Sequence, residues 1–157
     1  MSPSVDGTDR HGRHVHGGVP VVGVLGVGSL GKEHARIYAA LQREGLVRFA
    51  GVHDSLPALA ADVASRHGVR AFSSLAEAIA ECEALSVVTP TVTHASLATE
   101  AMQAGRHVLV EKPMTDSAGG AAALVALARE RGGIRSEEYT SELQSGQYVV
   151  CRLLLEK

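Results

Sequence analysis

Hydrophobic residues follow two alternating patterns along the middle of the chain. Short runs rich in Val, Leu and Ala predict buried strands at residues 19–25, 47–53, 69–72, 85–89 and 107–111. Between these runs, hydrophobic residues recur every three to four positions, which predicts helices at residues 32–44, 56–67, 74–81, 93–104 and 116–131. This alternation is typical of βαβ units, so we expect an α/β fold with a mostly parallel sheet covered on both faces. A doubly wound Rossmann-type sheet fits best, and a flavodoxin-like sheet is the alternative.

Capping residues support several of these helix positions. Ser74 and Glu77 have the spacing of a capping box. Gly105 stands where a helix commonly ends. We expect the side chains of Thr93 and Asp116 to cap the N-termini of the two later helices.

The two ends of the chain do not share this pattern. Residues 1–18 are polar and have no hydrophobic periodicity, so we expect a leader without regular structure. Three histidines in it are closely spaced, but no other ligand type accompanies them, and we expect no metal site; they are His11, His14 and His16. Residues 135–145 resemble the translation of a short-read sequencing adapter, with Tyr139 where the adapter would give His. We therefore interpret residues 135–157 as a non-native tail, the alternative being a genuine extension, and place the domain at residues 19–134.

Composition narrows the function classes. The chain has 157 residues, of which 45% are hydrophobic and 20% charged, which suits one globular domain. A formal net charge of -2 without a Lys/Arg stripe argues against nucleic-acid binding. No hydrophobic run approaches the length of a membrane span, and residues 1–18 are polar throughout, so we expect no signal peptide. Cys82 and Cys151 are far apart in the sequence, which favours a reducing compartment, so we expect a cytoplasmic protein.

A glycine-rich turn follows the first predicted strand. Gly26, Gly28 and Gly31 form a GxGxxG pattern between that strand and a helix. The first glycine permits the tight turn, the second lets a pyrophosphate approach the backbone, and the third lets the helix pack closely. With Ser29 and Leu30 between them, these residues are candidates for binding a dinucleotide at the helix N-terminus.

An acidic residue ends the second predicted strand. Asp54 follows Gly31 at about the spacing expected for a carboxylate that binds the adenosine ribose. Such a carboxylate repels a 2′-phosphate, and no arginine follows directly, so we expect NAD in preference to NADP. An N-cap role for Asp54 in the next helix is the simpler alternative, and both roles are compatible.

Two further strand ends carry candidate residues, because ligands of open α/β sheets gather at the carboxyl ends of the strands. Thr89, Pro90 and His94 follow the fourth strand and are candidates for lining the nicotinamide side; a packing or capping role is the alternative for His94. Glu111 and Lys112 follow the fifth strand, and Pro113 restricts how the chain leaves the sheet. Glu111 is a further candidate for cofactor binding. Lys112 is the catalytic candidate, because an ammonium group can hold a substrate hydroxyl and share its proton, whereas a solvated strand-end lysine is the alternative.

The order and spacing of residues 22–31, 89–94 and 104–113 resemble the Gfo/Idh/MocA oxidoreductases. The resemblance covers about residues 19–134 and implies an NAD(P)-binding half of a two-domain dehydrogenase. The other half of such an enzyme binds a sugar, a sugar nucleotide or a polyol, and Lys112 matches the family lysine that contacts substrate and cofactor. Residues 28–38 resemble members that act on UDP-N-acetylglucosamine. We expect the present chain alone to be inactive and the full-length form to be capable of homo-oligomerisation.

Two other functions stay open at this point. A non-catalytic nucleotide-binding or redox-sensing module would keep the glycine turn and Asp54 but would have no use for Lys112. A flavodoxin-like or methyltransferase-type domain would bind another nucleotide.

Overall fold

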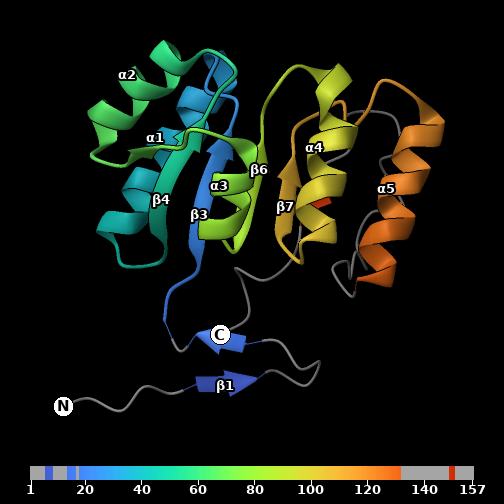
Figure 1. Cartoon of the computed structure of the whole chain (residues 1–157), viewed down its shortest axis with the longest axis horizontal. Helices are drawn as coiled ribbons and strands as arrows, with labels where there is room; N and C mark the ends of the chain where they lie inside the picture. The colour runs from blue at the N-terminus through green and yellow to red at the C-terminus, as the bar shows by residue number, and fades with distance from the viewer. Residues whose placement is uncertain (1–5, 9–13, 17, 132–148, 151–157) are drawn as a thin grey trace.

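A mostly parallel sheet forms the centre of the molecule (Figure 1). The computed structural model describes residues 6–8, 14–16, 18–131 and 149–150. The strands of the sheet are β3 (Val21–Leu25), β4 (Arg48–His53), β5 (Arg70–Ala71), β6 (Ala84–Val87), β7 (His107–Val110) and β8 (Val149–Val150). The helices are α1 (Ser29–Arg43), α2 (Pro57–His67), α3 (Leu75–Glu81), α4 (Thr91–Gln103) and α5 (Ala118–Glu130).

The strand order decides between the two predicted sheets. It runs β5-β4-β3-β6-β7-β8, with parallel pairing from β5 to β7 and antiparallel pairing of β8 with β7. The first strand, β3, therefore lies between the second and the fourth, as in a Rossmann sheet. A flavodoxin-like sheet would pair the first strand with the third, so that alternative is wrong. Every predicted strand and helix between residues 19 and 131 is present, with its ends shifted by a few residues.

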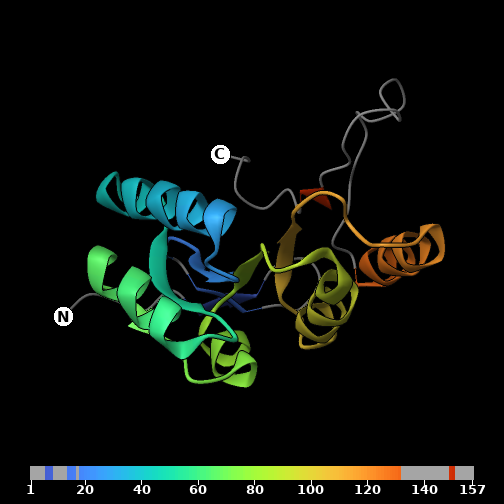
Figure 2. The ribbon, with the colours of Figure 1, turned by 90° about the horizontal axis from the view of Figure 1, so that it is seen from above.

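Two hydrophobic clusters cover the two faces of the sheet (Figure 2). Alternate strand residues face opposite sides, so Val22 and Val24 join one cluster while Leu25 joins the other. Helices α1 and α2 close the first face, and α3, α4 and α5 close the second. Burial in the second cluster raises the pKa of the Cys82 thiol to about 12, so this thiol is protonated and unreactive at neutral pH.

Two predicted caps differ from the structure. Helix α5 is capped by Ser117, whose hydroxyl accepts the Gly120 N–H at 3.1 Å, so the prediction of Asp116 as the cap is wrong. Helix α4 starts at Thr91, directly after Pro90, so Thr93 lies inside the helix. The Thr93 hydroxyl donates to the Pro90 carbonyl oxygen at 2.7 Å instead of capping the helix.

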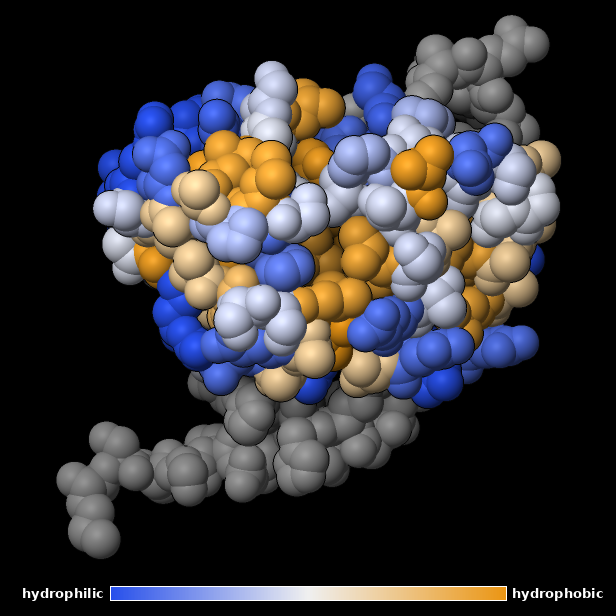
Figure 3. Space-filling view, turned by 45° about the horizontal axis from the view of Figure 1, so that its top comes forward, coloured by the Kyte–Doolittle hydropathy of each residue, from blue (hydrophilic) through white to orange (hydrophobic). Residues whose placement is uncertain are grey.

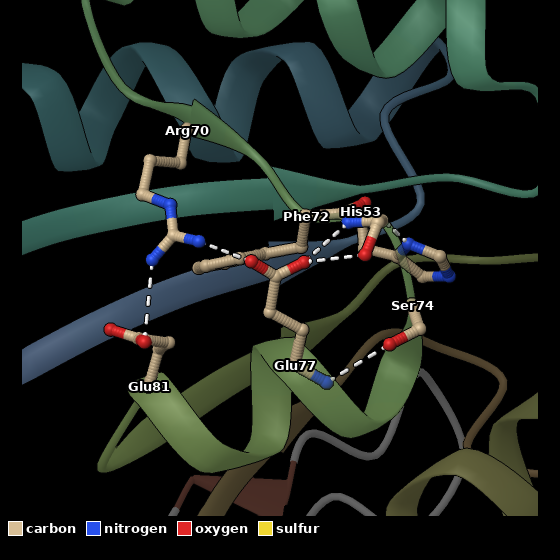
Figure 4. Close-up of polar contacts among 7 residues, drawn as sticks. His53, Arg70, Phe72, Ser74, Glu77 and Glu81 are labelled. Atoms are coloured by element: carbon tan, nitrogen blue, oxygen red, sulfur yellow. Dashed lines mark hydrogen bonds and ion pairs between the residues drawn. The ribbon is translucent and has the colours of Figure 1, made fainter.

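Of the capping box predicted for α3, the bond to the Ser74 hydroxyl is confirmed, whereas the Glu77 carboxylate binds a different N–H (Figure 4). The Ser74 hydroxyl accepts the Glu77 N–H at 3.1 Å. The Glu77 carboxylate, however, accepts the backbone N–H of Ser73 at 2.7 Å and its hydroxyl at 2.8 Å. The same carboxylate pairs with Arg70, which also reaches Glu81 at 3.3 Å. The hydrogen bond from the Ser73 backbone is the largest cause that lowers the Glu77 pKa below its ordinary value.

Glu77→Gln is expected to lower the Tm at neutral pH and to leave it unchanged in acid. A carboxyl whose pKa is lowered by folding stabilises the protein above its ordinary pKa, and this stabilisation is lost as the pH falls through the folded value. Thermal melts of wild type and variant between pH 7 and pH 3 measure the difference. Glu100→Gln, at an exposed position of α4, is the control and is expected to leave the Tm unchanged at every pH. A Tm difference for Glu77→Gln that persists at low pH would contradict this assignment.

The chain ends differ in part from their predictions. Where the sequence predicts an unstructured leader, β1 (Asp6–Thr8) and β2 (His14–His16) pair antiparallel. Pairing of this length needs only backbone groups, which a polar sequence also provides. His11 lies outside the described residues, as does most of the tail at residues 135–157. Val149 and Val150 form a short strand that pairs with β7.

No helix in the described part of the chain is long and hydrophobic enough to cross a membrane.

Candidate functional site

The candidate residues gather at the carboxyl edge of the sheet, on both sides of the boundary between β3 and β6. Because these strands are parallel, the segments after β3, β4, β6 and β7 all begin at this edge, at the top of Figure 1. The chain leaves β3 toward β4 on one side, whereas β6 pairs with β3 on the other. Open α/β sheets bind their ligands where the connections diverge in this way.

Gly26 and Gly31 make the first turn possible. Gly26 has φ +84°, and a Cβ added to it would lie 2.8 Å from the Thr89 backbone nitrogen. A Cβ on Gly31 would lie 1.9 Å from the Gly26 carbonyl oxygen. No side chain fits at either position, so helix α1 and the loop after β6 both pack directly against the turn.

Gly28 differs from these two glycines, because a Cβ added to it would meet no atom within 4 Å. It occupies the N-cap of α1, where no side chain accepts a hydrogen bond from the helix, and the first turn of α1 holds no acidic residue. Among the residues that the structure describes, no carboxylate or hydroxyl therefore caps the N–H groups of Ser29 and Leu30 at the positive end of the helix dipole. Uncapped N–H groups beside an exposed glycine suit an anionic phosphate.

The Asp54 carboxylate joins this turn to the end of β4. One oxygen accepts the Val27 N–H at 2.8 Å and the other accepts the Leu56 N–H at 2.9 Å. The N-cap of α2 is Leu56, so Asp54 forms an Asx turn before the helix and is not its N-cap. Each oxygen keeps further acceptor capacity, which ribose hydroxyls can use.

His94 lies beneath the loop that follows β6. Its side chain is 2% exposed. Its Nε2 lies 2.6 Å from the Thr89 carbonyl oxygen, and its Nδ1 lies 3.0 Å from the Pro113 carbonyl oxygen. The Thr89 and Thr93 hydroxyl oxygens lie 2.7 Å apart, while Pro90 is exposed. The geometry gives His94 the packing role that the sequence left open, between two loops of the site.

Glu111 and Lys112 end β7 at the same edge. Glu111 Oε1 lies 2.9 Å from His34 Nε2, and Glu111 Oε2 accepts the Lys112 N–H at 3.1 Å. His34 and Glu111 are largely buried, whereas Lys112 is exposed and its peptide bond to Pro113 is cis. Both oxygens of Glu111 thus have protein partners, and Lys112 is exposed at this edge of the sheet.

The sequence argument missed two polar pairs. His34 of α1 meets Glu111 across 77 positions, and Tyr38, one turn further along α1, shares a 2.7 Å hydrogen bond with Ser86 of β6. Burial raises the Tyr38 pKa above its ordinary value. Only the helical spacing of His34 and Tyr38, which puts them on one face of α1, hinted at such contacts.

Hydrophobic side chains are exposed at the starts of three helices along this edge. They are Leu30, Leu56 and Val92, with exposed fractions of 58%, 63% and 72%. Figure 3, turned to bring the upper edge of Figure 1 forward, shows hydrophobic patches between hydrophilic ones on this face. Exposed apolar side chains around a polar turn suit a ligand with flat rings as well as phosphates. Among the described residues, no group of three His, Cys, Asp or Glu side chains is placed to hold a metal.

Comparisons with known proteins agree with this geometry. The family model described as "Oxidoreductase family, NAD-binding Rossmann fold" matches residues 21–139. UDP-N-acetylglucosamine 3-dehydrogenase of Acidithiobacillus ferrooxidans is 48% identical over 109 residues, which are 69% of this chain and 33% of the relative. Its solved structure superposes with a TM-score of 0.68 at 46% identity, covering 73% of this chain and 36% of that one.

Two further dehydrogenases are similar to this chain. Inositol 2-dehydrogenase of Rhizobium meliloti is 37% identical over 94 residues, covering 59% of this chain and 27% of the relative. The WlbA dehydrogenase of Bordetella pertussis, solved with NADH and UDP-GlcNAcA, has a TM-score of 0.65 at 32% identity, covering 73% of this chain and 35% of that one. The chain therefore spans about a third of the length of these proteins.

Proposed function

Since the chain belongs to the Gfo/Idh/MocA oxidoreductase family, we propose that residues 19–134 bind the NAD of a dehydrogenase that acts on a carbohydrate. The family match and the three relatives described above, each named a dehydrogenase, support an enzyme and not the alternative of a non-catalytic module. In the proposed reaction a hydride moves between a hydroxyl-bearing carbon and a nicotinamide. Bound NAD would supply that nicotinamide as the hydride acceptor.

One observation carries the proposal: Gly28 has open space beside it at a helix N-terminus without a side-chain cap, and the residue before it, Val27, is held by Asp54. The Val27 N–H that Asp54 accepts belongs to the same turn as Gly28. Phosphates fit against the Ser29 and Leu30 N–H groups, and ribose hydroxyls fit the remaining capacity of Asp54. The exposed Leu30 and Leu56 side chains suit the adenine ring.

The remaining candidates serve the reacting side. Thr89 and Pro90 lie after β6, where the nicotinamide half belongs in this fold. The Lys112 ammonium group is suited to hold the substrate hydroxyl and to share its proton as the carbon is oxidised. Glu111 is oriented by two hydrogen bonds, so in this proposal its role toward the cofactor runs through the backbone that it fixes.

A sugar nucleotide is the substrate class that we propose. The support is the identity with UDP-N-acetylglucosamine 3-dehydrogenase and the structural similarity to a dehydrogenase solved with UDP-GlcNAcA. We place the enzyme in the cytoplasm, where a free cysteine such as Cys82 stays reduced, and we propose a homo-oligomer for the full-length form.

Calorimetric titration of the chain with NAD and NADP tests the cofactor proposal. We expect NAD to bind more tightly than NADP, because the Asp54 carboxylate repels a 2′-phosphate. Asp54→Asn keeps the size of the side chain and removes its charge, so NAD should bind roughly tenfold more weakly while the preference over NADP shrinks. Asp62→Asn, at an exposed position of α2, is the matched control and should bind like wild type. Absence of NAD binding by a well-folded wild type would overturn the proposal.

A further inference from the structure

Two imidazoles contact the residues on either side of Lys112. The residue before it, Glu111, lies 2.9 Å from His34 Nε2 through its carboxylate. The residue after it, Pro113, lies 3.0 Å from His94 Nδ1 through its carbonyl oxygen. The catalytic candidate thus stands between two fixed neighbours, while its own side chain is exposed.

These contacts are shielded from water. The side chains of His34 and Glu111 are 15% and 13% exposed, and His94 is 2% exposed. Buried polar groups are costly unless they are hydrogen-bonded, so such contacts persist and fix the atoms that they join. Glu111 Oε2 also accepts the Lys112 N–H at 3.1 Å, which extends the restraint from His34 to the lysine backbone.

The two histidines come from the two helices that flank the proposed cofactor site. His34 lies in α1, behind the N–H groups proposed to bind phosphate, and His94 lies in the first turn of α4. His94 Nε2 also lies 2.6 Å from the Thr89 carbonyl oxygen, so one ring joins the loop after β6 to the loop after β7. The position of Lys112 is therefore set by the same helices that shape the cofactor site.

We propose that His34 and His94 are positioning residues that hold the backbone on both sides of Lys112 and thereby place its ammonium group. The proposal rests on the proposed function for the chemistry that Lys112 performs, but the placement itself is a property of this chain. Neither histidine needs to touch substrate or cofactor.

Asparagine and glutamine variants test the two contacts with opposite expectations. The amide nitrogen of Gln reaches the position of a histidine Nε2, and that of Asn reaches the position of Nδ1. At His34 the Nε2 contact matters, so Gln should preserve the placement of Lys112 and Asn should lose it. At His94 the Nδ1 contact with Pro113 matters, so Asn should preserve the placement and Gln should lose it.

The placement is read from Lys112 directly. Reductive methylation with carbon-13 formaldehyde labels the lysines, which are Lys32, Lys112 and Lys157, and a Lys112→Arg sample assigns the resonance of interest. We expect this resonance to shift in His34→Asn and His94→Gln and to match wild type in His34→Gln and His94→Asn. His67→Asn, at the last residue of α2, is the control and should leave it in place. If the histidines had a purely structural role, all four variants would have a lower Tm. The Lys112 resonance would then not depend on which amide, Asn or Gln, replaces each histidine.

Three outcomes separate the possibilities. A Lys112 resonance that is the same in all folded variants overturns the positioning role. If a variant at one histidine fails to fold, the comparison of the Asn and Gln variants at the other histidine still tests the positioning role. If wild type binds no NADH, the proposed function fails, whereas the resonance of the cofactor-free chain still tests the placement. In an enzyme that joins this domain to a substrate-binding domain, His34→Asn should lower kcat roughly tenfold and change the KM for NAD less than twofold.

Discussion

Gly31→Ala is expected to lower the Tm by roughly 10 °C or to prevent folding, a cost of about 3 kcal/mol or more for a methyl group forced into filled space. The added Cβ would lie 1.9 Å from the Gly26 carbonyl oxygen, which is backbone and has no rotamer to change. Helix α1 must then move away from the turn, and the Ala35 side chain, which is fully buried on the same helix, moves with it. Circular dichroism melts measure the effect.

Gly28→Ala is the matched control for this substitution. Its Cβ would meet no atom within 4 Å, so the Tm should change by no more than about 2 °C. The same methyl group stands where a pyrophosphate would approach the backbone, so the affinity for NAD should fall at least about tenfold. Equal Tm losses for the two variants would contradict the division between a packing glycine and a binding glycine.

Lys112→Ala is expected to lower kcat by about a hundredfold or more, the range for removal of a group that transfers a proton. The dissociation constant for NAD should change less than twofold, because the proposed phosphate and ribose contacts lie at Gly28 and Asp54. Turnover can be measured in a chimera in which residues 1–131 replace the matching region of the Acidithiobacillus ferrooxidans relative, which is 48% identical over 109 residues.

Lys112→Arg separates the two roles assigned to the ammonium group. Arginine keeps the positive charge that holds a hydroxyl but does not give up its proton. We expect Lys112→Arg to keep the KM for the sugar near the wild-type value and to lose kcat nearly as far as Lys112→Ala. Full turnover by either variant would remove Lys112 from the chemistry.

The periodicity of the sequence predicted the element order because each strand and helix buries a face of its own. Val22 and Val24 face one cluster while Leu25 faces the other, and this two-sided burial is what makes the strand a continuous hydrophobic run. The ends of the helices were harder to predict. Lys32 was expected to open α1, but the helix begins at Ser29, because Gly31 packs against Gly26 and tolerates the helical conformation there.

Two kinds of feature could not be predicted from the sequence: the choice between adjacent capping residues, and contacts between residues far apart in the chain. Asp116 and Ser117 both have good capping side chains, so the sequence does not distinguish them, and the structure has Ser117 as the cap. The contacts that join His34 to Glu111 and His94 to Pro113 connect residues 77 and 19 positions apart. No local pattern encodes such pairs, since they arise only when the parallel strands bring their ends to one edge. The candidate site was therefore predicted as separate segments, without the hydrogen bonds between them.

The double attachment of Asp54 limits how coenzyme preference can change in this scaffold. Asp54 is the residue that a protein engineer would replace first to admit a 2′-phosphate, yet its carboxylate also accepts the Val27 N–H of the glycine-rich turn. A single exchange for a small neutral residue would relax selectivity and loosen the grip on both coenzymes together. A successful conversion to NADP would have to bring a new acceptor for that amide, so we expect the switch to require at least two coordinated substitutions.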